Sequence, residues 1–503
     1  MNIDSIKTLG DLKKSNYRPH SIKDEMRDNL IKYLKNNENA FRGIIGYEDT
    51  VIPELQTAIL SRHNIILLGL RGQAKTKIAR LMINLLDEYI PVIDNTEIND
   101  DPFNPISVTA RRIIQENGDD TPLRWMHRNE RYTEKLATPD VSVADLIGDV
   151  DPIKAASLKL PYSDERVIHF GLIPRSHRSI FVINELPDLQ ARIQVALFNI
   201  LEERDIQIRG FKVRMPLDIQ FIFTANPEDY TNRGSIVTPL KDRIDSQILT
   251  HYPKTHEYSR AITEQEANLA EDQKTKIETP ELLKELVELI AFEARDSEYI
   301  DSKSGVSARL TISAYENLIS TAERRNLLNG DGKTTSRISD LFGVIPSVTG
   351  KIELVYEGEQ EGPYKVAQIL IGKAIKSHFT SLFPNPENLK KTENTSPYQP
   401  IVNWFQKGNK LDLLSNLSKK DYEKNLLNVP GLSDIVNKYY KKEKDEDKLL
   451  LMEFVLFGLS EHSLLSRYKL ENGIQFKDML SSMFTMPSSD ESLEDDDPDI
   501  FNS

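Results

Sequence analysis

The amino-acid sequence predicts an α/β fold, a parallel sheet flanked by helices, followed by a helical domain and a mostly helical C-terminal region. Between Ile44 and Tyr252, short apolar β-prone runs alternate with helical patterns, which is typical of a parallel sheet. A glycine-rich turn joins the first apolar run to the first helical pattern. From Tyr258 to about Arg325 the apolar residues recur at helical spacing throughout, which predicts a separate helical domain.

The composition excludes several classes of protein. The 503 residues predict about three domains, and 64 Lys and Arg against 78 Asp and Glu give a net charge of −14. No overall attraction to nucleic acid or anionic lipid follows from that charge. The absence of cysteine excludes disulfides, thiolate metal ligands and cysteine nucleophiles. Since the chain starts without an apolar signal core and contains no apolar stretch of about 20 residues, we expect a soluble, cytoplasmic protein without a membrane span.

Six segments are expected along the chain. Their boundaries are 1–43 for an N-terminal helical arm, 44–256 for the α/β domain, 257–325 for the helical domain, 326–389 for a mixed segment, 390–487 for a helical module and 488–503 for an acidic tail. In the arm, Leu30, Ile31 and Leu34 form a short apolar stripe. The tail carries seven acids and no base, so we expect it to be disordered.

Three apolar runs in the α/β domain predict its central strands. They are NIILLG (64–69), SIFVIN (179–184) and DIQFIFTAN (218–226). A helix is expected over 75–89, because apolar residues recur there at helical spacing. The long polar stretch between Ile90 and Phe170 is expected to hold insertions rather than a second core.

Beyond Asn326, the segment 342–362 is expected to form turns and a strand. The apolar segment 364–383 predicts a helix ended by Pro384, because proline cannot continue a helix. Residues 387–400 are polar and predict a linker into the final helical module.

The strongest chemical signal is the sequence GLRGQAKT between an apolar strand and an amphipathic helix, the context that a phosphate-binding P-loop requires. Its candidate nucleotide-binding residues are Gly69, Gly72, Gln73, Ala74, Lys75 and Thr76. Backbone N–H groups and the helix N-terminus can bind phosphates there, Lys75 can reach the β- and γ-phosphates, and the Thr76 hydroxyl can ligate magnesium. The alternative is a plain strand-to-helix turn.

Ala74 departs from the usual P-loop pattern, which has glycine at this position. An alanine adopts a positive φ angle only at a cost in free energy. We therefore expect the loop to use a conformation open to L-residues at Ala74.

The apolar run 179–184 ends in Asn184 and is followed by Glu185, where folds of this kind place an acidic pair. Glu185 is expected to polarise the attacking water as a general base or positioning group. Asn184 stands where an aspartate normally orders magnesium, and its amide oxygen can still bind a metal-coordinated water without contributing charge. Alternatively, Asn184 is a strand-end residue satisfied by local hydrogen bonds and Glu185 is a solvated acid.

Three further residues are candidates for the same chemistry. Asn226 ends the third apolar run, although an Asn before Pro is also common in turns. Arg243 stands between Asp242 and Asp245, a pattern that by itself indicates a surface ion pair. Arg309 lies near the start of a helical pattern, where the alternative is a solvated helix face.

In this order the motifs resemble the AAA+ ATPases, and more closely the branch of the magnesium chelatase I subunit and the MoxR-type chaperones. The resemblance covers roughly residues 44–325 and includes LIGDVDP (146–152), similar to that branch's helix-2 insert, and 205–214, similar to its hairpin before sensor 1. It assigns the Walker A pair to Lys75 and Thr76, the Walker B pair to Asn184 and Glu185, sensor 1 to Asn226, the arginine finger to Arg243 and sensor 2 to Arg309. It also implies that residues 257–325 form the lid domain.

The resemblance implies an ATP- and Mg²⁺-dependent homo-oligomeric ring, a hexamer in the family, in which Arg243 meets nucleotide bound by the neighbouring subunit. It further implies a protein client and a partner with a von Willebrand factor A domain. One alternative, motivated by Asn184, is a nucleotide-gated scaffold with little hydrolysis. Another is a nucleic-acid-acting AAA+ protein, but the chain lacks a GAFTGA loop and a basic helix-turn-helix.

Overall fold

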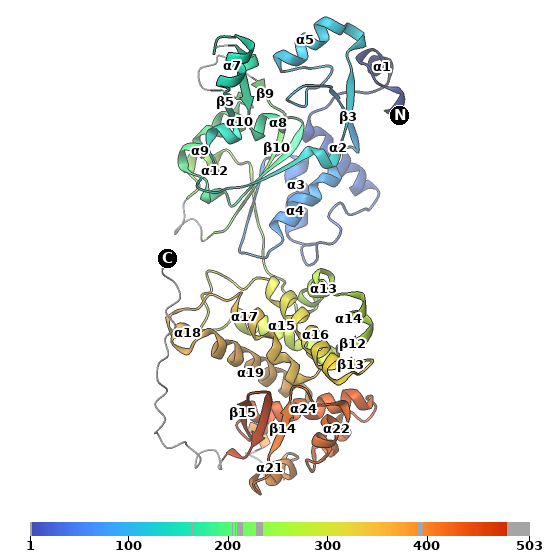
Figure 1. The fold of residues 1–503 in the computed structure, drawn as a ribbon, viewed down its shortest axis with the longest axis vertical. Helices are drawn as coiled ribbons and strands as arrows, with labels where there is room; N and C mark the ends of the chain where they lie inside the picture. The colour runs from blue at the N-terminus through green and yellow to red at the C-terminus, as the bar shows by residue number, and fades with distance from the viewer. Residues whose placement is uncertain are drawn as a thin grey trace. The chain divides into compact units, whose positions relative to one another are not determined.

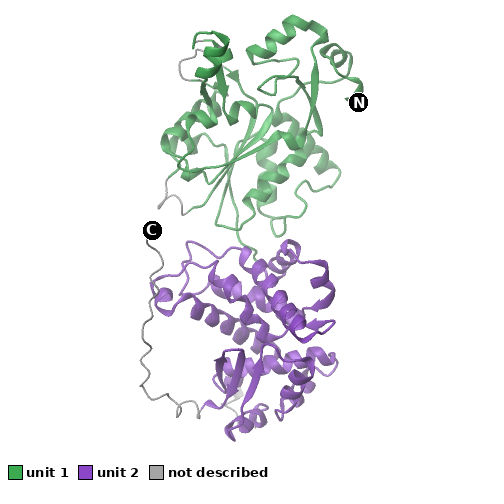
Figure 2. Ribbon diagram, viewed as in Figure 1, with its two compact units in different colours: residues 1–254 green, residues 255–503 purple. Residues whose placement is uncertain are grey.

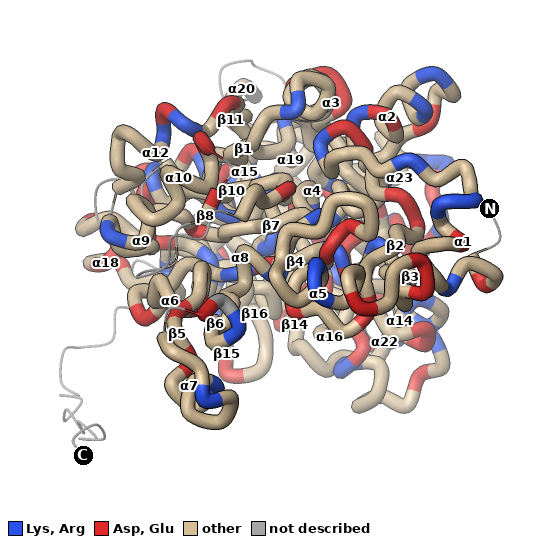
Figure 3. The backbone as a smooth tube through the Cα atoms, turned by 90° about the horizontal axis from the view of Figure 1, so that it is seen from above, with Lys and Arg blue, Asp and Glu red and all other residues tan. Residues whose placement is uncertain are grey.

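The computed structural model describes residues 3–162, 164–203, 205–206, 208, 215–227, 235–389 and 396–479. These form two compact units, residues 1–254 and 255–503 (Figure 2). The expected acidic tail, 488–503, lies outside the described residues, as do parts of the expected hairpin at 205–214 and of the linker at 387–400. Figure 3 shows Lys and Arg interspersed with Asp and Glu over the described residues of both units.

Unit 1 is built on a five-stranded sheet in the order β11-β1-β10-β7-β4 (Figure 1). The strands are β1 (Ile65–Leu68), β4 (Tyr132–Leu136), β7 (Ser179–Asn184), β10 (Ile219–Ala225) and β11 (Ser246–Leu249). All four pairings are parallel, so the carboxyl ends of the five strands lie along one edge. The expected parallel sheet and its three apolar strands are confirmed.

Helices cover both faces of this sheet (Figure 1). Successive strand residues point to opposite faces, so Leu67 and Val182 pack with Ile78 on one face while Ile66 and Phe181 belong to the core of the other. The first face is covered by α2 (Ile22–Lys35), α3 (Val51–Leu60) and α4 (Lys75–Leu81), and the second by α9 (Ala191–Ala196), α10 (Phe198–Glu202) and α12 (Thr238–Asp242). The sheet therefore lies between two hydrophobic cores, one on each face.

The N-terminal arm forms α1 (Leu9–Lys14) and α2. The buried residues of α2 pack with those of α3, α4 and the five-stranded sheet. Ile22, Met26 and Leu30 are buried at i, i+4 and i+8, whereas Leu34 of the expected stripe is 43% exposed. The side chain of Glu25, on α2, accepts two hydrogen bonds of 2.6 Å from Arg131 in the sheet unit, and both side chains are buried.

The helix expected over 75–89 is shorter than predicted. It ends at Leu81, continues as a 3-10 turn over Met82–Leu85, and is followed by β2 (Tyr89–Ile93), so Tyr89 is a strand residue. β2 pairs with β3 (Leu123–His127), and this pairing competes with helix propagation.

The polar stretch 90–170 contains insertions around one strand of the main sheet, β4, which the sequence reading missed. Its further elements include α5 (Val108–Asn117), α6 (Val143–Leu146), β5 (Gly148–Val150), α7 (Pro152–Leu158) and β6 (Ile168–Phe170). Beyond this stretch, α8 (Leu172–Arg175) precedes β7, and the short pair β8 (Asp205–Ile206) and β9 (Met215–Pro216) follows it. The sequence of β4, YTEKL, is polar because this strand is half-buried and, within the described part of the chain, pairs only with β7 at the edge of the sheet.

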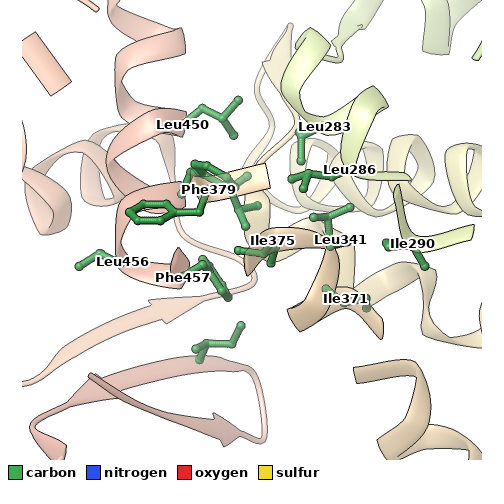
Figure 4. Close-up of a cluster of buried hydrophobic side chains, with 14 of the residues drawn as sticks. Leu283, Leu286, Ile290, Leu341, Ile371, Ile375, Phe379, Leu450, Leu456 and Phe457 are labelled. Carbon is green, nitrogen blue, oxygen red and sulfur yellow. The ribbon is translucent and has the colours of Figure 1, made fainter. Parts of the chain in front are cut away.

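Unit 2 is mainly helical. Its buried hydrophobic residues between Ile277 and Phe476 form one core, part of which is shown in Figure 4. Its helices are α13 (His256–Glu266), α14 (Glu271–Lys276), α15 (Glu281–Arg295), α16 (Arg309–Asn329), α17 (Ile345–Thr349), α18 (Tyr356–Glu361), α19 (Pro363–Leu382), α20 (Pro386–Leu389), α21 (Gln399–Gln406), α22 (Lys419–Leu427), α23 (Leu432–Tyr439) and α24 (Asp445–Glu461). The expected helix ended by Pro384 is α19. Among the described residues, no helix is both long enough and apolar enough to cross a membrane.

One expectation for unit 2 is wrong. The segment 342–362 forms α17 and α18 rather than a strand, and its only described β contact is the bridge between Leu354 and Ile300, because its apolar residues pack into the helical core. The C-terminal region is mostly helical as expected, and its final module also contains a sheet in the order β14 (Leu411–Leu414), β16 (Gly473–Lys477) and β15 (Ser466–Leu470). A further short pair joins β12 (Ile277–Glu278) to β13 (Thr334–Thr335).

Candidate nucleotide site

The glycine-rich loop connects the carboxyl end of β1 to the amino end of α4. Ala74 precedes the helix with φ 58° and ψ 15°, in the left-handed region, and Gly72 also has a positive φ of 73°. The expectation that Ala74 avoids this region is therefore wrong. The turn from strand to helix imposes the same backbone conformation on alanine as on glycine, at a cost of about 1–2 kcal/mol.

Tyr47 and residues that follow β11 hold the loop in place. The buried Gln73 side chain accepts a hydrogen bond of 2.7 Å from the Thr250 hydroxyl, and the Tyr252 hydroxyl donates to the Arg71 carbonyl at 3.0 Å. The Tyr47 hydroxyl lies 3.1 Å from the Gln73 carbonyl, and burial raises the pKa of Tyr47 to about 12. A Cβ on Gly69 would lie 2.0 Å from the Thr250 hydroxyl oxygen, so only glycine fits there.

Lys75, the first residue of α4, is 8% exposed. Its ammonium group donates to the carbonyls of Gly69 and Leu70, the latter at 3.0 Å, and so lies within the loop. Thr76 follows it in the first turn of the helix and is half-buried. The structure thus brings the helix N-terminus, the lysine and the threonine hydroxyl together at the end of β1, the arrangement that binds phosphate and magnesium.

Asn184 ends β7, two strands away from β1, and is 8% exposed. Its amide oxygen accepts a hydrogen bond of 3.0 Å from the Thr224 hydroxyl on β10. The same hydroxyl accepts a hydrogen bond of 3.2 Å from the backbone N–H of Glu185. Glu185 itself has φ 54°, in the left-handed region, and is half-buried. A single hydroxyl therefore links both residues assigned to the Walker B pair.

On its other side, the Asn184 amide nitrogen donates to the carboxylate of Glu134 on β4. The other oxygen of Glu134 accepts from Arg80 of α4 at 3.0 Å and from the Tyr132 hydroxyl at 3.3 Å. The local hydrogen bonds expected under the strand-end alternative for Asn184 are thus present, and they are made on the sheet face that α4 covers. Sequence reasoning missed Glu134 and Thr224, although each stands at the alternate position of its strand that shares the face of α4.

Asn226 follows the last residue of β10 and is 5% exposed. Among the described residues, its amide oxygen is buried and makes no hydrogen bond. A buried polar atom left unsatisfied costs free energy, so a ligand with a donor group at this strand end would stabilise it.

Arg243 follows α12 and precedes β11. Its guanidinium group pairs with Glu202 at 2.7 Å and lies 4.9 Å from the centre of the Phe198 ring. Because β11 runs parallel to β1, Arg243 lies toward the amino ends of the strands, whereas the P-loop lies at the carboxyl ends. The surface ion pair expected on sequence grounds is present, with Glu202 rather than with Asp242 or Asp245.

Arg309 is the first residue of α16 and is exposed. It belongs to unit 2, whereas the P-loop belongs to unit 1.

Residues 123–244 match the model of the AAA domain of the dynein-related subfamily. The matched segment contains β4, β7 and β10, and hence Glu134, Asn184 and Glu185. Unit 1 therefore contains an AAA+ domain. The P-loop AAA+ module expected from the sequence is confirmed, and the helical unit that follows agrees with the expected fold class.

Solved structures with similarity to this chain include three nucleotide- or chelatase-related proteins. They are NtrX from Brucella abortus in complex with ADP (13% identity, 72% of this chain, 71% of that chain, TM-score 0.37), Hsp104 with ATPγS and FITC casein (14%, 62%, 50%, 0.37) and the BchI–BchD complex of magnesium chelatase (17%, 64%, 98%, 0.33). No curated protein matches the sequence at a significant level.

Proposed function

We propose that this AAA+ protein binds ATP with Mg²⁺ and hydrolyses it. The observation that carries the proposal is the meeting of three strand ends at one sheet edge: Lys75 follows β1, Asn226 follows β10 and Glu185 follows β7. A lysine at a helix N-terminus, a buried amide and a carboxylate are the groups needed to hold a triphosphate and orient an attacking water.

The residues at this edge fit a magnesium ion bound with ATP. The Thr76 hydroxyl is the candidate direct ligand, and the Asn184 amide oxygen, which accepts one hydrogen bond, retains a second lone pair for a metal-bound water. Bound magnesium neutralises charge on the β- and γ-phosphate oxygens. In this chain, Lys75 binds the same phosphates, Glu185 orients the attacking water and accepts its proton, and the Asn226 amide contacts the γ-phosphate or that water.

We further propose that the subunits form a homo-oligomeric ring, a hexamer by family resemblance, that remodels a client protein. Arg243 would complete the site of the neighbouring subunit, and its distance from the P-loop along the sheet supports a role across the boundary rather than within one chain. Residues 257–325, with Arg309 on α16, would act as the lid. A partner with a von Willebrand factor A domain belongs to the same proposal.

A second candidate is a nucleotide-gated scaffold with little hydrolysis. The amide of Asn184 is engaged on both sides, by Thr224 and Glu134, and brings no charge to the cation. The measured turnover of ATP separates the two functions, because the scaffold would bind ATP without releasing phosphate.

Nucleotide affinity tests the binding half of the proposal. In equilibrium dialysis with MgATP, we expect Lys75→Ala to lose at least about tenfold in affinity, because a cation contacting phosphate is removed. Lys77→Ala is the matched control, since Lys77 lies on the same helix and donates to the Gly43 carbonyl instead. Equal affinities of wild type and Lys75→Ala would overturn the P-loop assignment.

A further inference from the structure

The polar side chains beside the P-loop helix form one directed chain of hydrogen bonds. The Glu185 backbone N–H donates to the Thr224 hydroxyl, which donates to the Asn184 amide oxygen, and the Asn184 amide nitrogen donates to Glu134. All three hydrogen bonds therefore run in the same direction, from Glu185 toward Glu134. The series ends at Glu134 because an ionised carboxylate only accepts hydrogen bonds.

Glu134 therefore fixes the orientation of the Asn184 amide. The strand order places β4 on one side of β7 and β10 on the other, with the P-loop strand β1 beyond β10. Because the amide nitrogen must face the carboxylate on β4, the amide oxygen faces β10 and thus the P-loop side of the sheet. An uncharged group at position 134 that donates as well as accepts would leave both amide orientations open.

Glu134 also carries the charge that Asn184 lacks. Its side chain is 23% exposed and is joined directly to Asn184, so a full negative charge lies one hydrogen bond away from the position where an aspartate is usual. Arg80, which is 63% exposed on α4, pairs with the far oxygen of this carboxylate and partly offsets the charge.

We propose that Glu134 is a positioning residue of the nucleotide site, whose carboxylate on β4 orients Asn184 and supplies the negative charge for the magnesium ion of MgATP. This inference rests on the proposed function. On this inference, a carboxylate on β4 supplies the negative charge that an aspartate at the end of β7 would otherwise supply.

The test measures the dissociation constant of a fluorescent ATP analogue with Mg²⁺ and with EDTA, and takes the ratio of the two as the magnesium advantage. Groups that support a metal's ligands change metal affinity by about 10–100-fold when altered, so we expect Glu134→Gln to reduce this advantage about tenfold while affinity in EDTA stays the same. The double variant Asn184→Asp/Glu134→Gln moves the charge onto β7 and should restore the advantage. Glu130→Gln, at an exposed ion pair with Arg124, is the matched control and should leave it unchanged.

Arg80→Gln provides an independent test with the opposite sign. It removes a cation from an exposed position and should raise the magnesium advantage, so the inference stays falsifiable even if Glu134→Gln fails to fold. A purely structural role for Glu134 would lower the melting temperature of Glu134→Gln without changing the advantage, and that result would overturn the inference alone. Absence of ATP binding by the wild-type protein would overturn the proposed function as well.

Discussion

Gln73 and Thr250, which are 177 residues apart in the chain, are joined by a buried hydrogen bond of 2.7 Å between their side chains. Gln73 lies in the P-loop, which follows β1, and Thr250 follows β11, the edge strand next to β1. The hydrogen bond therefore fixes the P-loop to the end of the neighbouring strand. The loop conformation therefore depends on the folding of the whole sheet rather than on the loop sequence alone.

Thr250→Val should destabilise the protein and weaken nucleotide binding. The variant keeps the shape of the side chain but leaves the buried side-chain amide oxygen of Gln73 without its donor, which costs about 1–3 kcal/mol. Urea unfolding gives the loss of stability, and titration with MgATP gives the loss of affinity. Thr57→Val, at an exposed threonine of α3, should change the stability by less than about 0.5 kcal/mol.

Ala74→Gly should stabilise the protein by about 0.5–1 kcal/mol. The substitution removes the cost of a left-handed alanine, about 1–2 kcal/mol, and part of this gain is offset by the greater entropy of the unfolded chain. Ala79→Gly, in the interior of α4, should instead destabilise it by at least about 1 kcal/mol. Urea unfolding gives the free energy of unfolding of each variant. A decrease relative to wild type in both variants would contradict the strain at Ala74.

The pair of His20 and Asp87 should make stability depend on pH. The hydrogen bond with Asp87 raises the pKa of His20 above its ordinary 6.5, and the same hydrogen bond lowers the pKa of Asp87 from 3.8 to about 2. The contribution of His20 is therefore full below pH 6.5 and is lost as the pH rises through its folded-state pKa, while that of Asp87 is present above pH 3.8 and is lost as the pH falls toward 2.

The free energy of unfolding of wild type and His20→Gln, measured between pH 5 and 9, checks this expectation. The difference between the two proteins should be largest near pH 5–6 and should shrink toward pH 9. Asp87→Asn should remove the same pH dependence, because it removes the partner of the imidazolium. A difference that grows with pH would contradict the assignment.

Arg243 should act across a subunit boundary. Because a cation at the developing charge on the γ-phosphate accelerates hydrolysis by about 10³-fold or more, Arg243→Ala and Glu185→Gln should each lack turnover. Rings mixed from the two variants contain some junctions with an intact Glu185 facing an intact Arg243, and these should recover hydrolysis. Lys241→Ala, in the last turn of α12 just before Arg243, should retain activity. Verified mixed rings without hydrolysis would exclude the role across the boundary.

The sequence was sufficient to predict the elements whose residues carry strong local signals. The runs 64–69, 179–184 and 218–226 are apolar because β1, β7 and β10 lie inside the sheet, and a glycine-rich turn before a helical pattern marks the P-loop. The strand β4 was missed because its polar sequence, YTEKL, reflects a place at the sheet edge that only tertiary structure creates.

The residues of the candidate site that sequence reasoning missed were also missed because their role depends on tertiary structure. Glu134 and Thr224 matter through their contacts with Asn184, and such contacts between strands leave no pattern along the chain. The left-handed Ala74 shows the limit of residue preferences, because the fixed geometry between β1 and α4 outweighs a cost of about 1–2 kcal/mol. In the C-terminal module, the sequence RYKLENGIQFK did carry a local signal, since two β-prone runs flank a turn at Glu471 and Asn472, and this signal was missed.

The rate of ATP hydrolysis by Glu185→Gln, measured together with its affinity for MgATP, tests the central claim most directly. We expect MgATP binding to be retained and turnover to fall by about 10²–10⁴-fold, because the carboxylate that accepts the proton of the attacking water is replaced by a neutral amide. Glu130→Gln should hydrolyse ATP at the wild-type rate. Wild-type turnover in Glu185→Gln would contradict the proposed assignment of this strand end as the site of ATP hydrolysis.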